Sequence, residues 1–421
     1  MDISFVKQTM ASDVFRKAAE TLAAKGLLIA IGLLTSVVVA RILGPEGRGF
    51  YAVATAVAAF GIQFGNAGLH ASNSYHVAKD RSLLGPLLGN TMAASLAFGG
   101  GISVLSLAVF QFRPDLAPLP KGLLILSLAW IPFGLAFMLL QNLMIGIQDI
   151  RAYNIVEVMN RVLSIAFVAI LIAAGAVTAE SVYVAGFIAL LASIFWIFRR
   201  LRRAIAHPPV LSLPMFLGNL RYGLKAYLAA LFAFMVLRID LLMVKYIRGA
   251  DEAGYYSIAV SMVDLIYLIP ATIGTIVFPK LSAMGTDAEK WEYARKMSLY
   301  LGVVLAVVVA VAIPLAPILI SLLYGKAFLP AAPSFAILGV GVVFYGLNNL
   351  YSNCLAAMSF PWFAVWIWVA MAALNVLLNM YLIPRMGIVG ASLSSLVCYL
   401  ALMLSQYAYL ARKGGRFAGQ A

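Results

Sequence analysis

Five charged side chains in this sequence lie inside long apolar stretches, and they are the residues best placed to do chemistry. A charge at the centre of a membrane helix costs roughly 2.5–3.5 kcal/mol, so it normally faces protein or water and marks a functional site. Lysine or arginine there supplies charge-assisted hydrogen bonds to an anion, whereas aspartate can hold a proton or a sodium ion. The five residues are Lys25, Arg161, Arg238, Asp240 and Asp264.

Arg238 is the leading candidate for binding an anion. Leu237 and Ile239 flank it, and no acidic residue stands three or four positions away. Asp240 is two positions on, where a helix turns its side chain to another face. We therefore expect Arg238 to be an isolated positive charge held for a ligand, with Asp240 and Asp264 as the candidates for ion coupling.

Arg161 and Lys25 are the second choices for the same anion. Glu157 precedes Arg161 by four residues, the favourable order for an ion pair along a helix, so this arginine could be neutralised within its own helix. Lys25 lies near the end of its apolar stretch, from which its ammonium group could reach the membrane interface.

Polar residues also line one face of the second apolar stretch, and two of them are candidate substrate contacts, Asn66 and His70. The set of which they are part runs at spacings of i, i+3, i+7, i+10 and i+11: Gln63, Asn66, His70, Asn73 and Ser74. Hydrogen bonding between packed helices explains such a face equally well. A lone histidine is also more often a packing residue than a proton relay.

The patterns of catalysis and of metal binding are absent from the sequence. It has no G-x-x-x-x-G-K-[ST] phosphate loop, and its three histidines form no H-E-x-x-H pair. The two cysteines, Cys354 and Cys398, lie in apolar segments and indicate neither a disulfide framework nor a metal site. We predict no catalytic residue, no metal and no cofactor, and a protein that is not an enzyme.

The elements that position these residues are membrane helices. Of the 421 residues, 63% are hydrophobic and 11% are charged, less than half the charge of an average soluble domain. Mean hydropathy is +0.98. Stretches of about 20 apolar residues, the length of a bilayer span, occur at 22–41, 50–69, 86–112, 121–146, 156–176, 180–198, 223–246, 255–278, 298–324, 332–357, 362–383 and 388–410. The sequence thus predicts an all-α polytopic membrane protein of about twelve spans.

Basic residues give these spans an orientation. The net charge is +14, and most lysines and arginines fall in alternate connections, with the densest cluster at 199–203. The positive-inside rule then places both termini in the cytoplasm. Because the basic residues flank apolar runs, nucleic acid is not an expected partner.

Two segments of the chain echo each other at an offset of 205 residues. Gly44-Pro-Glu-Gly-Arg-Gly-Phe-Tyr-Ala-Val-Ala54 aligns with Gly249-Ala-Asp-Glu-Ala-Gly-Tyr-Tyr-Ser-Ile-Ala259. A duplication of six spans predicts two six-helix lobes, 1–205 and 206–421, related by a parallel internal repeat. Transporters built from such repeats bind substrate between their lobes.

Several motifs resemble those of the polysaccharide flippases of the multidrug/oligosaccharidyl-lipid/polysaccharide exporter superfamily. They appear in order from about residue 10 to 410: Arg41-Ile-Leu-Gly-Pro-Glu-Gly-Arg-Gly-Phe-Tyr51, Arg238-Ile-Asp240 with Gly254-Tyr-Tyr256, Phe278-Pro-Lys-Leu-Ser282, Leu323-Tyr-Gly325 and Asn379-Met-Tyr-Leu-Ile-Pro-Arg-Met-Gly-Ile-Val-Gly-Ala391. Where many relatives have Asp before the Gly-Leu that ends the second span, this chain has Asn66, which argues against a cation site there.

The resemblance implies a function and a location. It implies alternating access of two lobes around a central cavity, and export of an undecaprenyl-pyrophosphate-linked oligosaccharide across the bacterial inner membrane for lipopolysaccharide or exopolysaccharide synthesis. The implied partners are that lipid-linked oligosaccharide, membrane lipids, H+ or Na+ as coupling ion, and a polysaccharide polymerase. The alternative is a multidrug cation antiporter of the same superfamily, which should favour acidic residues in its cavity.

Overall fold

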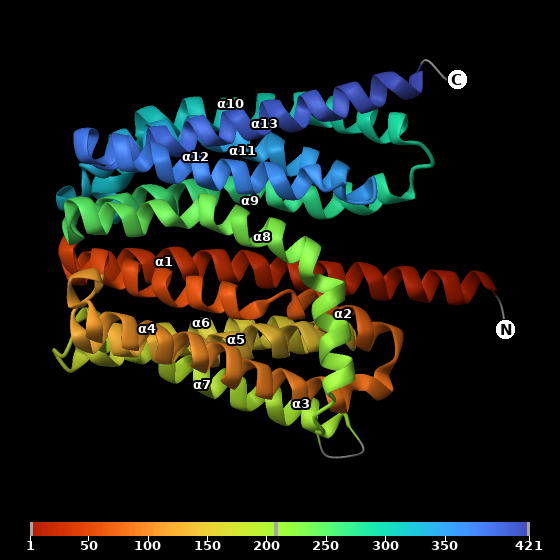
Figure 1. The fold of residues 1–421 in the computed structure, drawn as a ribbon, viewed down its shortest axis with the longest axis horizontal. Coiled ribbons are helices and arrows are strands. Elements are labelled where there is room, and N and C mark those ends of the chain that lie inside the picture. The colour runs from red at the N-terminus through yellow and green to blue at the C-terminus, as the bar shows by residue number, and fades with distance from the viewer. Residues whose placement is uncertain (1–2, 206–208, 419–421) are drawn as a thin grey trace. The chain divides into compact units, whose positions relative to one another are not determined.

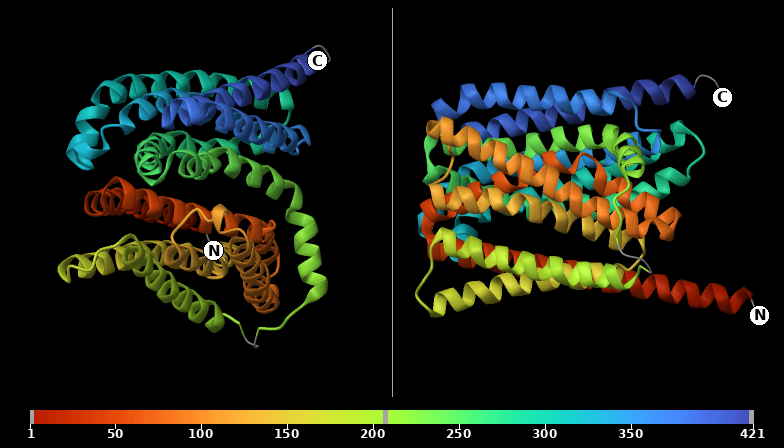
Figure 2. Two further views of the ribbon diagram at one scale, coloured as in Figure 1. Left: turned by 60° about the vertical axis from the view of Figure 1, so that its left-hand side comes forward. Right: turned by 60° about the horizontal axis from the view of Figure 1, so that its bottom comes forward.

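The computed structural model describes the backbone of residues 3–205 and 209–418, and the side chains of residues 26–205, 209–221 and 223–413. Within those ranges the chain is helical, without a β-strand (Figures 1 and 2). The α-helices are α1 (Ile3–Asn66), α2 (Leu69–Lys79), α3 (Leu84–Ala94), α4 (Gly100–Phe112), α5 (Lys121–Gly146), α6 (Ile150–Ala173), α7 (Ala179–Arg203), α8 (Leu213–Arg248), α9 (Ala250–Ala283), α10 (Asp287–Leu323), α11 (Ala331–Ala357), α12 (Phe363–Met386) and α13 (Ile388–Ala418). The predicted all-α class is confirmed.

The expected number of membrane spans is also confirmed. In the described part of the chain, 11 helical segments are long and apolar enough to cross a bilayer. The first of them, Gly26–Asn66, contains two helices that meet at Gly44, whose φ of 66° and ψ of −177° are not helical. The chain turns back on itself there (Figure 1). The predicted third span consists of α3, a π-helical turn at Ser95–Gly99, and α4.

Helix starts follow ordinary capping chemistry. Thr286 begins α10 with a capping box, because its hydroxyl accepts from the Glu289 N–H and the Glu289 carboxylate accepts from the Thr286 N–H. Thr178 and Ser181 make the corresponding box at the start of α7. At α7 this signal marks the boundary between two spans that are separated by only a short, weakly polar connection.

Two compact units make up the chain. The first comprises residues up to Ile42 together with Ala54–Tyr227, and the second comprises Leu43–Val53 together with residues from Leu228 onward. The core of the first contains fully buried leucines and isoleucines of α3, α5 and α7, among them Leu88, Leu140 and Ile197. The core of the second includes Val236 of α8 and Leu402 of α13. The lobe boundary at 205/206 stays a prediction.

The second unit contains residues Gly44–Val53 of the first copy of the repeated motif and the whole of the second copy, and the two copies contact each other reciprocally. A Cβ atom added to Gly49 would stand 1.8 Å from the carbonyl oxygen of Ala250, and one added to Gly254 would stand 2.0 Å from that of Pro45. Each glycine therefore allows the other copy's backbone to approach. Gly249, with φ 102° and ψ −178°, repeats the conformation that Gly44 adopts. Equivalent positions in equivalent contacts support the internal repeat.

Candidate functional site

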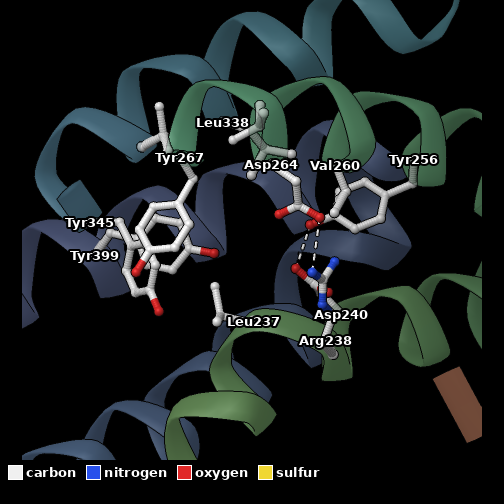
Figure 3. A pocket seen from close by; sticks show the side chains of 12 residues that line it. Leu237, Arg238, Asp240, Tyr256, Val260, Asp264, Tyr267, Leu338, Tyr345 and Tyr399 are labelled. Carbon is white, nitrogen blue, oxygen red and sulfur yellow. Dashed lines mark hydrogen bonds and ion pairs between the residues drawn. The ribbon is translucent and has the colours of Figure 1, made fainter. Parts of the chain in front are cut away.

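Two sites, one in each unit, contain four of the five charged residues that the sequence singled out. The site in the second unit is a small cavity of about 100 Å³ among α8, α9, α11 and α13. Figure 3 shows the side chains that line it, which come from these four helices. They are Leu237, Arg238, Asp240, Tyr256, Val260, Val263, Asp264, Tyr267, Leu338, Val342, Tyr345 and Tyr399.

Arg238 in this cavity is paired with an acid on the neighbouring helix. Its Nη2 donates to Asp264 Oδ2 at 2.9 Å, from α8 to α9 (Figure 3). The side chains keep 37% and 48% of their surface exposed. The expectation that Arg238 is isolated is therefore wrong: spacing along one helix excludes local partners, but it says nothing about an adjacent helix. The pair uses one N–H of the guanidinium fork, and an arginine has five.

Asp240 lines the same cavity as Arg238 but makes different contacts. Its side chain is 2% exposed. One oxygen accepts from the Leu241 N–H at 2.8 Å, and the other accepts from Ser395 Oγ at 3.0 Å and from the Tyr256 hydroxyl. These three donors replace water around the buried carboxylate.

Tyrosines form the rest of the cavity wall. The rings of Tyr267, Tyr345 and Tyr399 lie in sequence, with centroid separations of 4.8 and 4.9 Å. Tyr267 also accepts a hydrogen bond from Asn349 at 3.0 Å. A volume of about 100 Å³ is below the roughly 300–1,000 Å³ of sites for small organic ligands. The cavity can admit an ion or a few water molecules, and it is too small for a sugar.

Sequence reasoning identified only part of this cavity. Tyr256 stands in the Gly254-Tyr-Tyr256 motif, and Tyr345 lies in the predicted stretch 332–357. Ser395 and Tyr399 were missed. They are four residues apart and share a helical face, but neither is ionisable at neutral pH in isolation, so intramembrane charge could not reveal them.

The site in the first unit surrounds Arg161. A hollow of about 240 Å³ is lined by Leu28 and Ile29 of α1, Phe137 of α5, and Glu157, Asn160 and Arg161 of α6. Asn160 also donates to Ser193 Oγ of α7 at 3.2 Å, which ties α6 to its neighbour.

Arg161 and Glu157 line this hollow without pairing. Glu157 accepts a hydrogen bond from the Tyr153 hydroxyl at 3.1 Å. Among the side chains that the structure describes, Arg161 has neither an ion-pair partner nor a hydrogen-bond partner. The helical ion pair that the sequence suggested is therefore not formed. Arg161 stands near the middle of the 24-residue helix α6, which is one of the candidate spans.

The remaining candidate residues lie elsewhere. Asn66 is 1% exposed and ends α1, and its side chain bonds to the His70 ring, Nδ2 to Nδ1, at 2.7 Å. Ala67 and Gly68, both with positive φ, break the helix between them. Neither Asn66 nor His70 lines the Arg161 hollow, so their placement favours packing. Lys25 lies outside the residues whose side chains are described.

Comparison with known proteins supplies the family. Residues 14–285 match the sequence model of a family described as "Polysaccharide biosynthesis protein". An uncharacterized membrane protein of Methanocaldococcus jannaschii is 27% identical over 199 residues, which are 45% of this chain and 38% of that protein. The matched region thus spans well under half the length of this relative.

Solved structures show the fold in membrane transporters. The lipid II flippase MurJ, in an inward closed conformation, has a TM-score of 0.75 at 15% identity, with 92% of this chain and 87% of that chain covered. A multidrug resistance MATE family transporter of the MOP superfamily, in an inward-facing conformation, has a TM-score of 0.74 at 15% identity, with 94% and 96% covered. Both likenesses are similarities of fold.

Proposed function

Because this chain belongs to the polysaccharide biosynthesis protein family and has 11 candidate membrane spans in its described part, we propose that it is a flippase for a lipid-linked oligosaccharide. The substrate is an undecaprenyl-pyrophosphate-linked glycan, which the protein moves across the bacterial inner membrane by alternating access. Both termini are cytoplasmic, and a polysaccharide polymerase is the expected downstream partner. Its work is transport without covalent chemistry.

The observation that best supports this proposal is that Arg161 has no partner among the described side chains. A guanidinium near the middle of a membrane span is costly to leave without a counter-charge, and the described side chains supply Arg161 with none. Such a group is suited to an anion that arrives with the substrate. A pyrophosphate accepts the two parallel hydrogen bonds of an arginine fork. Arg161 therefore replaces Arg238 as the leading headgroup contact.

The Arg238 cavity suits ion coupling better than headgroup binding. Arg238 already holds Asp264, and the volume of about 100 Å³ matches an ion and not a sugar. Asp240 supplies a shielded carboxylate with three donors. A proton or a sodium ion that occupies this cavity would change its charge balance, and that change would favour one state of the transporter over the other.

Complementation of a flippase-deficient strain tests the headgroup role of Arg161: each variant is expressed in that strain and its glycan display is measured. Arg161→Ala should lower glycan display roughly ten- to a hundredfold, because a hydrogen bond to a charged group contributes about 1.5–3 kcal/mol. Arg161→Lys should retain part of the activity, since the charge survives and the fork does not. Membrane abundance is measured alongside, so that loss of protein is not mistaken for loss of transport.

Arg151→Ala is the matched control. Arg151 is an exposed arginine on the first turn of the same helix, where a basic residue can reach water. The Arg151→Ala variant should therefore support near-normal glycan display. If Arg161→Ala also supports normal display at normal abundance, the headgroup role is refuted, although the membership of the family is not.

The second candidate function is a multidrug cation antiporter, favoured by the two aspartates of the Arg238 cavity. A cationic drug would need these acids and would have no use for an unpaired arginine. Drug resistance that depends on Asp240 and Asp264 and survives Arg161→Ala would support the antiporter. Glycan export that depends on Arg161 would support the flippase.

A further inference from the structure

A third hollow lies on the second unit. It occupies about 670 Å³ along α10 and shares no residue with the cavities around Arg161 and Arg238. The lining residues of α10 recur at helical spacing, so they form one continuous face, and one residue of α11 closes the side. They are Arg295, Lys296, Ser298, Leu299, Gly302, Val303, Ala306 and, from α11, Leu347.

The hollow has a basic end and an apolar length. From Met297 to Leu323 helix α10 has no charged residue, so Arg295 and Lys296 are its last charges before an entirely uncharged stretch. This change places the pair at the boundary between the headgroups and the hydrocarbon core. Lys296 pairs with Glu292 at 2.7 Å, with both side chains more than half exposed. Within the described side chains, Arg295 makes no ion pair within 4 Å, although the charge of Glu292 one turn earlier acts on it.

The length of the hollow matches one membrane leaflet. Arg295 and Ala306 are eleven residues apart, which is about 16 Å along an α-helix. One leaflet of a typical bilayer contributes about half of a hydrocarbon core that is about 30 Å thick. A lipid whose phosphate is at Arg295 can therefore lay an acyl chain along the hollow as far as Ala306.

Gly302 creates the depth. A Cβ atom at this position would meet only the two methyl groups of Leu347, at 3.6 and 3.9 Å. Leu299 and Val303 on either side are 69% and 58% exposed, so they stand up as walls beside it. Between these two side chains the glycine adds no side chain of its own, so the helix backbone forms the floor of the hollow, which we call the slot.

We propose that this slot is a binding site for an anionic phospholipid of the phosphatidylglycerol type. The phosphate is held by the fork of Arg295 and the ammonium of Lys296, and one acyl chain lies over Gly302 between Leu299 and Val303. Charge complementarity selects an anionic lipid over a zwitterionic one, because basic residues at the membrane surface attract anionic headgroups. The slot shares no lining residue with the hollows around Arg161 and Arg238, and its occupant is a membrane component that is not transported.

Native mass spectrometry of the full-length protein tests the site. Protein stripped of lipid in mild detergent is incubated with equal amounts of phosphatidylglycerol and phosphatidylcholine. Wild type should retain phosphatidylglycerol in preference. Arg295→Gln should weaken that retention about fivefold, the factor expected for one basic residue near an anionic headgroup. Arg412→Gln, which removes an exposed arginine from α13, should leave it unchanged.

Filling the slot without changing charge gives a second, independent readout. Gly302→Leu should abolish the preferential retention, whereas Val307→Leu should not, because Val307 is on the same helix, is 59% exposed and lies outside the slot. Retention equal to wild type in either Arg295→Gln or Gly302→Leu overturns the proposal. So does preferential retention of a polyprenyl phosphate when it competes with phosphatidylglycerol, since the slot would then belong to the transported lipid.

Discussion

Replacing Gly49 with alanine should destabilise the second unit, because it adds one methyl group where two backbones cross. The new Cβ atom would stand 1.8 Å from the carbonyl oxygen of Ala250, whereas real Cβ atoms essentially never approach within 3.0 Å. The obstacle is backbone, so no side chain can rotate out of the way. The two segments must move apart by about 1 Å in a densely packed interior.

The expected cost follows from two opposing terms. Overpacking of a buried contact costs about 1–3 kcal/mol, and exchanging glycine for alanine inside a helix returns roughly 0.5–1 kcal/mol. The net effect is a decrease of about 1–2 kcal/mol in the free energy of unfolding. For a domain of 150–250 residues this lowers the melting temperature by about 2–4 °C per kcal/mol. Thermal unfolding of the purified protein, followed by size-exclusion fluorescence, measures this change in melting temperature.

A control and a double variant make the test specific. Gly101→Ala in α4 adds a methyl group with nothing within 4 Å, so it should raise the melting temperature slightly. Gly254→Ala should resemble Gly49→Ala, because its Cβ atom would stand 2.0 Å from the Pro45 carbonyl oxygen. The double variant, Gly49→Ala with Gly254→Ala, should lower the free energy of unfolding by less than the sum of the two single variants. One separation of the two segments relieves both clashes. A Gly49→Ala protein as stable as wild type would refute the reciprocal crossing.

Three further outcomes are expected. Arg238→Gln and Asp264→Asn should each lower membrane abundance more than the double variant does, because either single change leaves one charge of a 2.9 Å pair uncompensated; equal losses in all three would contradict an energetic pairing. Asp240→Asn should remove the dependence of glycan export on pH or sodium at normal abundance, because the carboxylate loses its charge; an unchanged dependence would exclude it from coupling. Cysteine labelling should place Arg203→Cys in the cytoplasm and Arg113→Cys outside. The two native cysteines are buried, so they should contribute little background. An external signal from Arg203→Cys would reverse the proposed orientation.

Helix content and span count could be predicted because they depend on local composition. A run of about 20 apolar residues must hydrogen-bond its own backbone in hydrocarbon, and a helix is the way a single segment does so. The break at Gly44 was equally local, since glycine tolerates the positive φ that a sharp turn requires. The echo between Gly44–Ala54 and Gly249–Ala259 predicted the repeat whose two copies meet in the second unit.

The charged sites could be located from the sequence but not described. Arg161 and Arg238 were marked by the cost of a charge inside an apolar span, and both line hollows. The sequence predicted an ion pair for Arg161 and none for Arg238, and the described side chains have the opposite arrangement. Arg161, with an acid four residues away, has no ion pair among the described side chains, and Arg238, without a helical acid, is bound to Asp264.

The physical reason is the difference between contacts along a helix and contacts across helices. Spacing of three or four residues shows which side chains share a face, and that much the sequence determined by itself. Which face of α9 or α13 meets α8 depends on packing among helices tens to more than a hundred residues apart. Only the tertiary structure brings Asp264 to Arg238 and Ser395 to Asp240, at 2.9 and 3.0 Å, and so decides which charge is neutralised and which remains for a ligand.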